Sequence, residues 1–587
     1  MNLFFSIGPM TTPESTSALT AHGLSLLADG RDADAVTAFQ ELSRIQPDHV
    51  AHWMNLGTAL RRLHQHDEAL LAYARAGALG EHSASFYFNV GLLHQDRGDY
   101  ESARRLLADA MHAAPADAEI CCQYAQCCYE SLRIEEAIEA LAGWEVWPGL
   151  DSESLATIAL LLLNLGESAA STKAAARATA DPALSPGALL HLAQIEERSN
   201  RVEAARTSLQ RLEAMPEAAA ALGADLELLK AQIALRQGRH EVARQGFTEL
   251  AAGCVELHRR HLYLFPLAKT LDALKRHDEA FARLEQAHEA QMLHLARSNP
   301  EATALREAPL VITRHGCSAE DVARWEDPAN PSTAESPVFI VAFPRSGTTL
   351  LEQMLDAHPR LVTMDEQPFL QYAIDRIMEH GVDYPAKLGR LTPEQLADAR
   401  EHYWSLTRRK ATLGPGQRLI DKNPLNLLRL PAIRRLFPRA RILLAIRHPC
   451  DVILSCFMQH FRAPEFAVLC RDLPTLAKGF HRSFDFWYQQ ATLLNPAVLE
   501  VRYEDFVADF EAQARAITAF VGLEWDAAQA KPAEHARARG YISTPSYAQV
   551  IEPVNRRAVG RWRPYAPYFG EALEILAPWL DRWDYEG

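Results

Sequence analysis

The chain has 587 residues and a formal net charge of −15, with 48% hydrophobic and 23% charged residues. This length is sufficient for separate hydrophobic cores, so we expect a multidomain globular protein. The acidic balance argues against a nucleic-acid partner. Membrane-spanning helices need roughly 20 apolar residues, which no window of the chain approaches, and the short apolar run in MNLFFSIGPM has no basic flank to make it a signal peptide.

An internal repeat marks the first half of the chain. Glycine, alanine and a larger apolar residue each recur at steps of 34 residues, and the larger residue follows the alanine by four positions. The positions are Gly23, Gly57 and Gly91, then Ala35, Ala69, Ala103 and Ala137, and finally Phe39, Tyr73, Leu107 and Leu141. Small residues let two helices approach, and the larger side chain fills the groove between them. The pattern resembles the helix pairs of tetratricopeptide repeats.

This resemblance implies an all-α, tetratricopeptide-type solenoid over residues 17–295. After Ala137 the phase weakens, and later pairs predict irregular repeats: Ala205/Leu209, Ala243/Phe247 and Ala280/Leu284. A terminal helix and a linker are expected over 296–336. The concave face of such a solenoid commonly holds a peptide or a partner protein. A purely structural role, in which the solenoid stabilises or dimerises the rest of the chain, stays open. The sequence does not predict the oligomeric state.

Nine cysteines, an odd number without a paired framework, predict a reducing compartment, and we expect a cytoplasmic protein. Four of them stand in the motif CCQYAQCC, at Cys121, Cys122, Cys127 and Cys128. They flank Ala125, a small-residue position of a repeat helix. Tight packing is therefore favoured over a metal site, which would need separated ligand pairs.

Residues 337–358, PVFIVAFPRSGTTLLEQMLDAH, pass from an apolar run through a small-residue turn into a helix. The turn consists of Arg345, Ser346, Gly347, Thr348 and Thr349. Its backbone N–H groups and the helix N-terminus can hold a phosphate group. A Walker A loop is excluded, because no Lys precedes the last Ser/Thr. An ordinary strand-turn-helix capped by Ser or Thr is the alternative.

The PRSGTT turn resembles the 5′-phosphosulfate loop of sulfotransferases, whose donor is 3′-phosphoadenosine-5′-phosphosulfate. The resemblance covers residues 337–587 and implies an α/β, P-loop-like sulfotransferase domain with a parallel sheet. It is strongest toward the tyrosylprotein sulfotransferases, which implies that the acceptor is a protein tyrosine or another macromolecule engaged by the repeats. The eukaryotic members of that branch are membrane-anchored in a secretory lumen. This chain differs from them because neither a membrane-spanning segment nor a signal peptide is predicted. The acceptor therefore stays open among a tyrosine, a glycan, a lipid and a small molecule.

Two charged residues that follow the first helix are matched to catalytic positions of the family. Glu366, in LVTMDEQPFL, falls on the catalytic base, which takes the proton of the acceptor hydroxyl. Lys422, in LIDKNPL, falls on a lysine that stabilises the bridging oxygen as the S–O bond breaks, together with Arg345 and Ser546. Without the flanking match, the acidic pair Asp365 and Glu366 could equally be a solvated helix start. A Lys before a turn is usually just exposed.

A second phosphate site is predicted in ARILLAIRHPCDVILSCF, residues 440–457. Arg447 follows an apolar run that predicts a buried strand. Its guanidinium can bind a phosphate through two parallel N–H···O hydrogen bonds. Ser455 lies two turns into the following helix on the same side. The family resemblance makes this pair the 3′-phosphate site. Tyr503, in VRYEDF, matches a family tyrosine near the nucleotide, and a half-buried packing aromatic is the alternative.

The stretch YISTPSYAQVIEPVNRRAVGRW, residues 541–562, resembles the closing loop that lies over the nucleotide in sulfotransferases. Its predicted donor contacts are Ser546, Gln549, Val550, Asn555 and Arg561. Arg561 stands where the tyrosylprotein branch has Lys, which keeps the charge but changes the donor geometry. A surface loop with a Pro turn is the alternative.

The combined hypothesis is in-line sulfuryl transfer without a metal, a reaction that depends on positioning and electrostatics. Two alternatives stay open. A repeat scaffold with an inactive nucleotide-binding domain would bind the donor without transfer. A P-loop kinase would require ATP and magnesium. Glu366 and Lys422 argue against the first, and the missing Walker lysine argues against the second.

Overall fold

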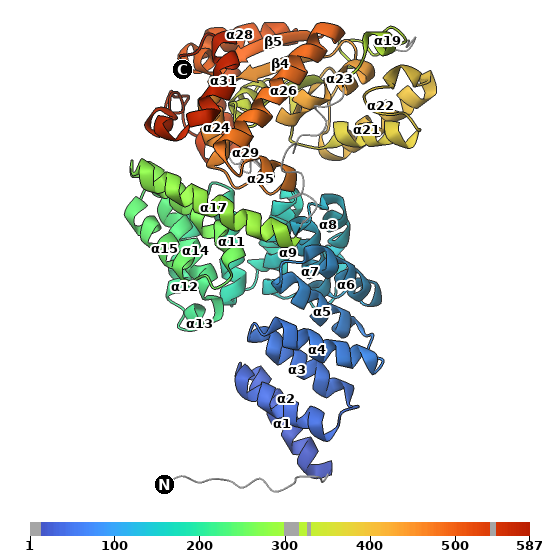
Figure 1. Ribbon diagram of the computed structural model, residues 1–587, viewed down its shortest axis with the longest axis vertical. Helices are drawn as coiled ribbons and strands as arrows, with labels where there is room; N and C mark the ends of the chain where they lie inside the picture. Colours follow the sequence, from blue (N-terminus) through green and yellow to red (C-terminus); the bar gives the residue numbers. More distant parts are fainter. Residues whose placement is uncertain (1–12, 299–315, 326–329, 540–546, 587) are drawn as a thin grey trace. The chain divides into compact units, whose positions relative to one another are not determined.

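In the computed structural model, residues 13–298, 316–325, 330–539 and 547–586 are described. They form two compact units, residues 1–195 and 196–587. A helical part precedes a domain with a parallel sheet, which confirms the predicted fold class (Figure 1). The predicted domain boundaries, 17–295, 296–336 and 337–587, stay predictions. The compact units follow a different division, because the last helices of the helical part belong to the same unit as the sheet.

The first unit is a stack of helix pairs in which neighbours along the chain pack together (Figure 1). Its helices are α1 (Pro13–Ala28), α2 (Asp32–Ile45), α3 (Val50–Arg62), α4 (His66–Ala78), α5 (Ala84–Asp96), α6 (Tyr100–Ala113), α7 (Ala118–Glu130), α8 (Ile134–Ala140), α9 (Ser152–Asn164), α10 (Ser168–Ala178) and the first part of α11 (Pro186–Arg198). A Cβ added at Gly57 would lie 2.6 Å from Cε1 of Tyr73. The repeating glycine is therefore needed because the large residue of the same repeat packs directly on its backbone.

All four cysteines of the CCQYAQCC motif are buried on α7. Burial raises the pKa of the Cys121 thiol to about 11 and that of Cys122 to about 12. These thiols are therefore protonated at neutral pH and serve as small packing groups, in line with the packing interpretation. All nine cysteines of the chain are free thiols.

The second unit begins with six more helices of the solenoid type. They are α12 (Val202–Glu213), α13 (Ala218–Leu222), α14 (Ala224–Arg236), α15 (His240–Gly253), α16 (His261–Ala273) and α17 (His277–Ser298). Helix α17 shares a hydrophobic core with the α/β part: Phe281 stacks on Tyr568 at 3.9 Å between ring centroids, and Nε2 of His288 lies 2.8 Å from the carbonyl oxygen of Phe457. The last repeats are therefore built into the same body as the sheet.

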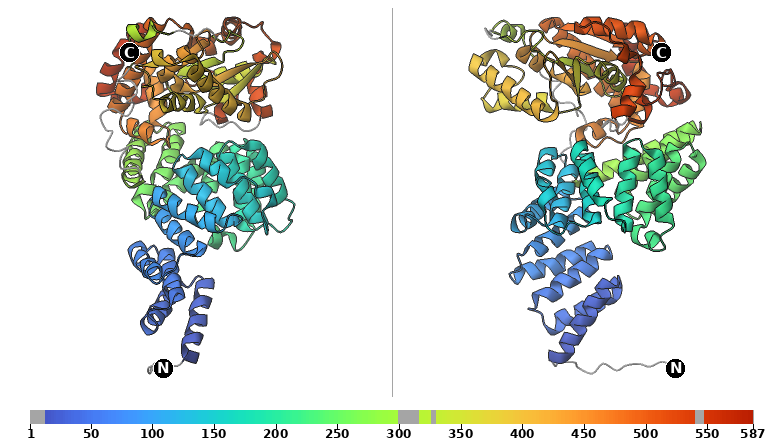
Figure 2. Two further views of the ribbon diagram at one scale, coloured as in Figure 1. Left: turned by 90° about the vertical axis from the view of Figure 1, so that its right-hand side faces the viewer. Right: turned by 180° about the vertical axis from the view of Figure 1, so that it is seen from behind.

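The sheet has five parallel strands in the order β2-β3-β1-β4-β5. The strands are β1 (Val338–Ala342), β2 (Leu361–Asp365), β3 (Arg418–Lys422), β4 (Arg441–Ile446) and β5 (Ala497–Arg502). Alternate residues of β1 belong to different cores: Ile340 packs in one cluster and Phe339 in another. The sheet is thus covered on both faces, as a fully apolar strand requires (Figure 2).

Helices connect the strands and cover the sheet. They are α19 (Ala319–Val322), α20 (Thr348–Asp356), α21 (Phe369–Glu379), α22 (Pro393–Lys410), α23 (Leu430–Leu436), α24 (Pro449–Phe457), α25 (Pro464–Leu469), α26 (Leu473–Leu494), α27 (Tyr503–Ala508), α28 (Phe510–Val521), α29 (Pro532–Arg539), α30 (Tyr547–Val550) and α31 (Gly570–Arg582). In the described part of the chain, none of the helices combines the length and apolarity needed to cross a membrane.

The strand order creates a switch point beside β1. From β1 the chain runs out to β2, returns through β3, and then passes to the other side of β1 for β4 and β5. In open α/β sheets, ligands bind outside the carboxyl ends of the strands at such a point. The turns after β1 and β4 therefore meet at the position where a ligand site is expected.

Candidate active site

The turn between β1 and α20 has the backbone form of an anion-binding loop. Arg345 (φ 70°) and Gly347 (φ 90°) both adopt left-handed conformations. Gly347 is the N-cap of α20 and brings no side chain to satisfy the first N–H groups of that helix. A Cβ at Gly347 would collide with the ring of Tyr503. A glycine is therefore required both by the backbone angle and by the aromatic ring that packs against it.

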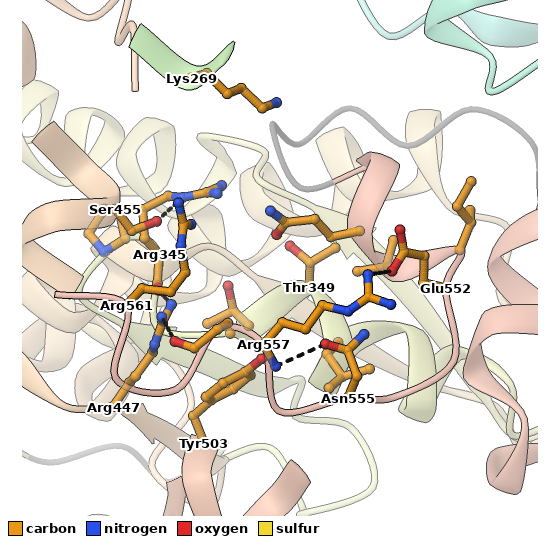
Figure 3. Close-up of a pocket in the computed structure, with 18 of the residues that line it drawn as sticks. Lys269, Arg345, Thr349, Arg447, Ser455, Tyr503, Glu552, Asn555, Arg557 and Arg561 are labelled. Atoms are coloured by element: carbon orange, nitrogen blue, oxygen red, sulfur yellow. Dashed lines mark hydrogen bonds and ion pairs between the residues drawn. The ribbon is translucent and has the colours of Figure 1, made fainter. Parts of the chain in front are cut away.

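The two predicted phosphate sites are in contact with each other. Nε of Arg345 donates to Oγ of Ser455 at 3.2 Å, and Nη1 of Arg447 donates to the carbonyl oxygen of Arg345 at 3.1 Å. The Arg447 guanidinium lies 5.0 Å from the centre of the Tyr503 ring, a cation–π distance. These four residues come from the ends of β1, β4 and β5 and from α24 (Figure 3). The fold thus gathers predicted residues that are far apart in sequence.

Arg447 retains a hydrogen-bond donor that the described protein atoms do not satisfy. Its side chain is largely buried, and Nη2 donates to the carbonyl oxygen of Ala558. Nε is buried and has no hydrogen-bond partner within the described ranges. A buried unpaired N–H on a cation is costly, and a phosphate oxygen would satisfy it. The residues present therefore fit the 3′-phosphate of a nucleotide.

The closing loop is fixed to α24 through Asp451. The buried Asp451 carboxylate accepts hydrogen bonds from the backbone N–H groups of Gly560 (2.7 Å) and Trp562 (2.9 Å). Gln549, Val550, Asn555 and Arg561 all line the cavity described below. The predicted contact Ser546 lies outside the described residues.

Glu366 and Lys422 occur together in a dense ionic cluster at the ends of β2 and β3. Nζ of Lys422 lies 2.9 Å from Oε1 of Glu366 and 3.4 Å from Oε2 of Glu352, and it also contacts Oδ1 of Asp365. Burial acts to lower the pKa of Lys422, but the three carboxylates outweigh it and raise that pKa. Lys422 is fully buried, whereas the Glu366 side chain is 42% exposed. Glu366 therefore faces the cavity and Lys422 lies behind it.

The acids around Lys422 differ in burial: Glu352 is buried, whereas Glu366 is partly exposed. Burial raises the pKa of the Glu352 carboxyl, and the neighbouring charge of Asp365 acts in the same direction. Both oxygens of Glu352 are buried without a hydrogen-bond partner among the described residues. Glu366 has a left-handed backbone (φ 44°), and its N–H donates to the carbonyl oxygen of Lys422 at 2.7 Å. A left-handed backbone is unfavourable for a residue with a side chain, and such strain is common at functional sites.

One cavity of about 780 Å³ encloses most of the predicted site. Of the predicted residues, it is lined by Arg345, Gly347, Thr348, Thr349, Glu366, Arg447, Ser455, Tyr503, Gln549, Val550, Asn555 and Arg561. Ser346 and Lys422 do not line it. The Ser346 hydroxyl donates to the carbonyl oxygen of Phe343 at 2.7 Å and so supports the turn from inside. The cavity is large enough for a nucleotide-sized ligand together with part of a second molecule.

The repeats supply part of the cavity wall, which sequence reasoning missed. Lys269 of α16 lines it (Figure 3). Asp272 of the same helix, Arg236 of α14 and His240 of α15 line it too. The 34-residue pattern consists of the small and large packing positions and does not include these four residues. Arg557 was also missed, although it lies in the closing loop. It pairs with Glu552 at 2.8 Å, and its N–H donates to Oδ1 of Asn555 at 3.1 Å.

Comparison with known families and proteins agrees with this arrangement. A model described as "Sulfotransferase family" matches residues 337–527, and tetratricopeptide-repeat models match residues 20–84, 95–147 and 157–220. Protein-tyrosine sulfotransferase 2 of Gallus gallus is 28% identical over 262 residues, which are 42% of this chain and 69% of that protein. Protein-tyrosine sulfotransferase 1 of Danio rerio is 27% identical over 260 residues, 42% of this chain and 72% of that protein.

An uncharacterized protein of Aquifex aeolicus is 26% identical over 326 residues, which are 53% of this chain. The match spans 41% of that protein, less than half of its length. The similarity to the named enzymes is confined to less than half of this chain. The predicted recognition is confirmed: tetratricopeptide-repeat models match the first part of the chain, and a sulfotransferase-family model matches the part that follows.

Proposed function

We propose that the chain transfers a sulfuryl group from 3′-phosphoadenosine-5′-phosphosulfate to an acceptor hydroxyl. The observation that carries this proposal is the meeting of Arg345, Arg447 and Ser455 at the switch point of the sheet, inside a cavity that Glu366 also faces. Two cationic sites side by side suit a ligand that carries phosphate at two ends. The sulfotransferase-family match over 337–527 supports the same reaction class.

Within this proposal, the residues of the β1–α20 turn hold the 5′ end of the donor. Arg345 and the backbone N–H groups of Gly347, Thr348 and Thr349 bind its anionic oxygens, and the N-terminus of α20 adds favourable partial charge. Arg447 and Ser455 hold the 3′-phosphate. The remaining proposed donor contacts are Ser346, through its backbone, and Tyr503, Gln549, Val550, Asn555 and Arg561.

The proposed chemistry assigns one role to each charged group. The donor supplies the sulfuryl group when bound. Glu366 orients the acceptor hydroxyl and takes its proton at a carboxylate oxygen, because it is the exposed acid of the ionic cluster. Arg345, Lys422 and Ser546 stabilise negative charge on the departing oxygen. Lys422 is held by three carboxylates, so its contribution requires that it give up part of this contact.

A macromolecular acceptor, most simply a protein tyrosine, is the proposed substrate class. The named relatives are protein-tyrosine sulfotransferases, and the repeats offer a surface that in other proteins holds peptides. A peptide or protein partner for the repeats follows from the same argument. The cytoplasmic location and the absence of a metal stay predictions. An inactive donor-binding scaffold and an ATP-dependent kinase are the competing functions.

Calorimetric titration of the full chain with 3′-phosphoadenosine-5′-phosphate and with ATP-Mg separates these functions. We expect the bisphosphate to bind and ATP-Mg to bind more weakly. Arg447→Ala should weaken bisphosphate binding at least about a hundredfold, since it removes a buried charge-assisted contact. The matched control is Arg439→Ala, because Arg439 is exposed and precedes the opposite end of β4.

Transfer of labelled sulfuryl groups from the donor to tyrosine-containing peptides then tests catalysis. Binding of the bisphosphate without any transfer would favour the scaffold. Preference for ATP-Mg would overturn the sulfotransferase proposal. Equal loss of binding in both arginine variants would show that Arg447 acts through stability and not through the ligand.

A further inference from the structure

Lys269 is a cation of the repeats that faces the cavity. It lies on α16, and Figure 3 shows its ammonium group directed into the space above Arg345 and Thr349. The side chain is exposed and lines the cavity. Within the parts of the chain that the structure describes, Lys269 makes no hydrogen bond or ion pair. It therefore lies on the cavity wall as a charge without an ion-pair partner among the described residues.

Two acids in the surroundings of Lys269, Asp272 and Glu197, already have other partners. Asp272, one turn along α16, accepts from Nη2 of Arg561 at 2.6 Å and from the hydroxyl of Tyr565 at 2.8 Å. Glu197 accepts from Nη1 of Arg236 at 2.5 Å. Both carboxylates are thus paired with arginines. The charge of Glu197 acts to raise the pKa of Lys269, but burial and the neighbouring arginines outweigh it.

The environment of Lys269 is strongly positive. Burial lowers the pKa of its ammonium group, and the neighbouring charges of Arg345 and Arg236 lower it further. Enclosing a cation among other cations costs free energy unless an anion accompanies it. Arrangements of this kind are common where a protein binds a charged ligand. The cost is understandable if an anion occupies this part of the cavity during function.

Helix α16 is held firmly enough to present such a group. Phe265 packs against the ring of His460 at 5.5 Å between centroids, and His261 lies 4.8 Å from the same ring. Together with the ion pair between Asp272 and Arg561, these contacts fix α16 to the α/β part within one compact unit. Lys269 therefore has a defined position relative to the phosphate loop.

We propose that Lys269 forms a cationic subsite for an anionic group of a substrate, so that the last repeats are part of the active site. This inference rests on the proposed function. Two sources carry the required chemistry: the sulfuryl end of the donor, and a carboxylate or phosphate beside the acceptor hydroxyl. In either case Lys269 contributes to substrate binding and not to proton transfer.

The test uses the full chain with Lys269→Gln, Lys269→Arg and a control, Lys275→Gln. Lys275 is exposed two residues after the end of α16 and does not line the cavity, so its variant removes the same charge from the same region. Three affinities are measured by calorimetry: for 3′-phosphoadenosine-5′-phosphate, for the sulfated donor, and for inorganic sulfate added to donor-saturated protein. Thermal melting checks that each variant is folded.

The two sources give different results. If Lys269 binds the sulfuryl end, Lys269→Gln weakens the sulfated donor about tenfold and leaves the bisphosphate unchanged. If it binds an acceptor anion, both nucleotides bind as before, and inorganic sulfate binds the donor-saturated variant about tenfold more weakly. Lys269→Arg should retain most of either affinity, and Lys275→Gln should match the unmodified chain.

Equal affinities of Lys269→Gln and the unmodified chain in all three titrations would overturn the subsite. An equal loss of affinity in Lys275→Gln would also overturn the subsite, because the loss would then follow from the change in net charge. Failure of the unmodified chain to bind either nucleotide would instead overturn the proposed function. The two proposals can therefore fail separately.

Discussion

Asp272 and Arg561 form an ion pair at 2.6 Å across 289 positions of sequence. Asp272 belongs to repeat helix α16, and Arg561 belongs to the closing loop that lines the cavity. The same loop also contacts α24, where the Asp451 carboxylate accepts hydrogen bonds from the backbone N–H groups of Gly560 and Trp562. The end of the closing loop is thus fixed from two sides, once by the α/β part and once by the repeats.

We predict that Asp272→Asn weakens binding of 3′-phosphoadenosine-5′-phosphate about three- to tenfold. The substitution removes the charge that holds Arg561 toward the cavity, and a partly buried ion pair contributes about 1 kcal/mol. Titration calorimetry measures the effect. Asp278→Asn is the matched control, because Asp278 also joins the repeats to the α/β part, by accepting from the Tyr568 hydroxyl at 2.7 Å, without touching Arg561. Equal affinities in the two variants would refute this role for Asp272.

Glu366→Gln should separate binding from chemistry. The amide keeps the shape of the side chain but cannot accept a proton, so we expect transfer to fall about 10²- to 10⁴-fold while bisphosphate affinity stays within about twofold. Transfer of labelled sulfuryl groups to a peptide acceptor gives the rate. Glu379→Gln, at the exposed end of α21, is the control. A variant that transfers at the normal rate would exclude Glu366 as the base.

The sequence predicted the parts of the site that belong to local motifs. Arg345 and Arg447 each follow an apolar strand, and parallel strands bring such turns to one edge. The resemblance of both turns, in that order, to the sulfotransferase family predicted that the two arginines lie at one site, and the pairing of β1 with β4 brings them together. Glu366 was predicted in another way, from its match to the family's acidic position, and the structure places it directly after β2.

Side-chain direction and long-range contacts could not be predicted. A motif gives the position of Lys422 at the end of β3, but only the packed cluster with Glu352 and Asp365 turns it away from the cavity. Lys269 and Asp272 lie on a repeat helix whose pattern records helix-to-helix packing alone. Their neighbours in the closing loop are almost 300 residues away, so no local signal links them.

The repeat pattern itself yields a packing prediction. Gly57→Ala should destabilise the first unit by about 1–3 kcal/mol, because the new methyl group would lie within 2.6–2.8 Å of three carbon atoms of the buried Tyr73 ring. Gly253→Ala on α15 is the control, since nothing lies within 4 Å of the added Cβ. The control should be neutral or slightly stabilising. Urea unfolding followed by circular dichroism compares them, and equal stabilities would contradict the close approach.

Asp421 provides a pH-dependent test of the buried polar network under the sheet. It lies on β3, is fully buried, and accepts from the Tyr403 hydroxyl at 2.7 Å and from Nδ2 of Asn426 at 3.2 Å. Burial raises the pKa of its carboxyl to about 7. In the unfolded chain a carboxyl titrates near about 4, so the folded state binds this proton more tightly. The stability that follows from the raised pKa is complete below about pH 4 and is lost as the pH rises through about 7.

Asp421→Asn removes this titration and keeps a carbonyl oxygen for the Tyr403 hydroxyl. The variant should therefore gain stability relative to the unmodified chain as the pH rises from 5 to 8, by about 2–3 kcal/mol. Urea unfolding at four pH values in this range measures the difference, with Asp581→Asn on the exposed side of α31 as the control. A difference that does not change with pH would mean that Asp421 stays ionised in the folded protein. The charge of Lys422 beside it would then outweigh the effect of burial.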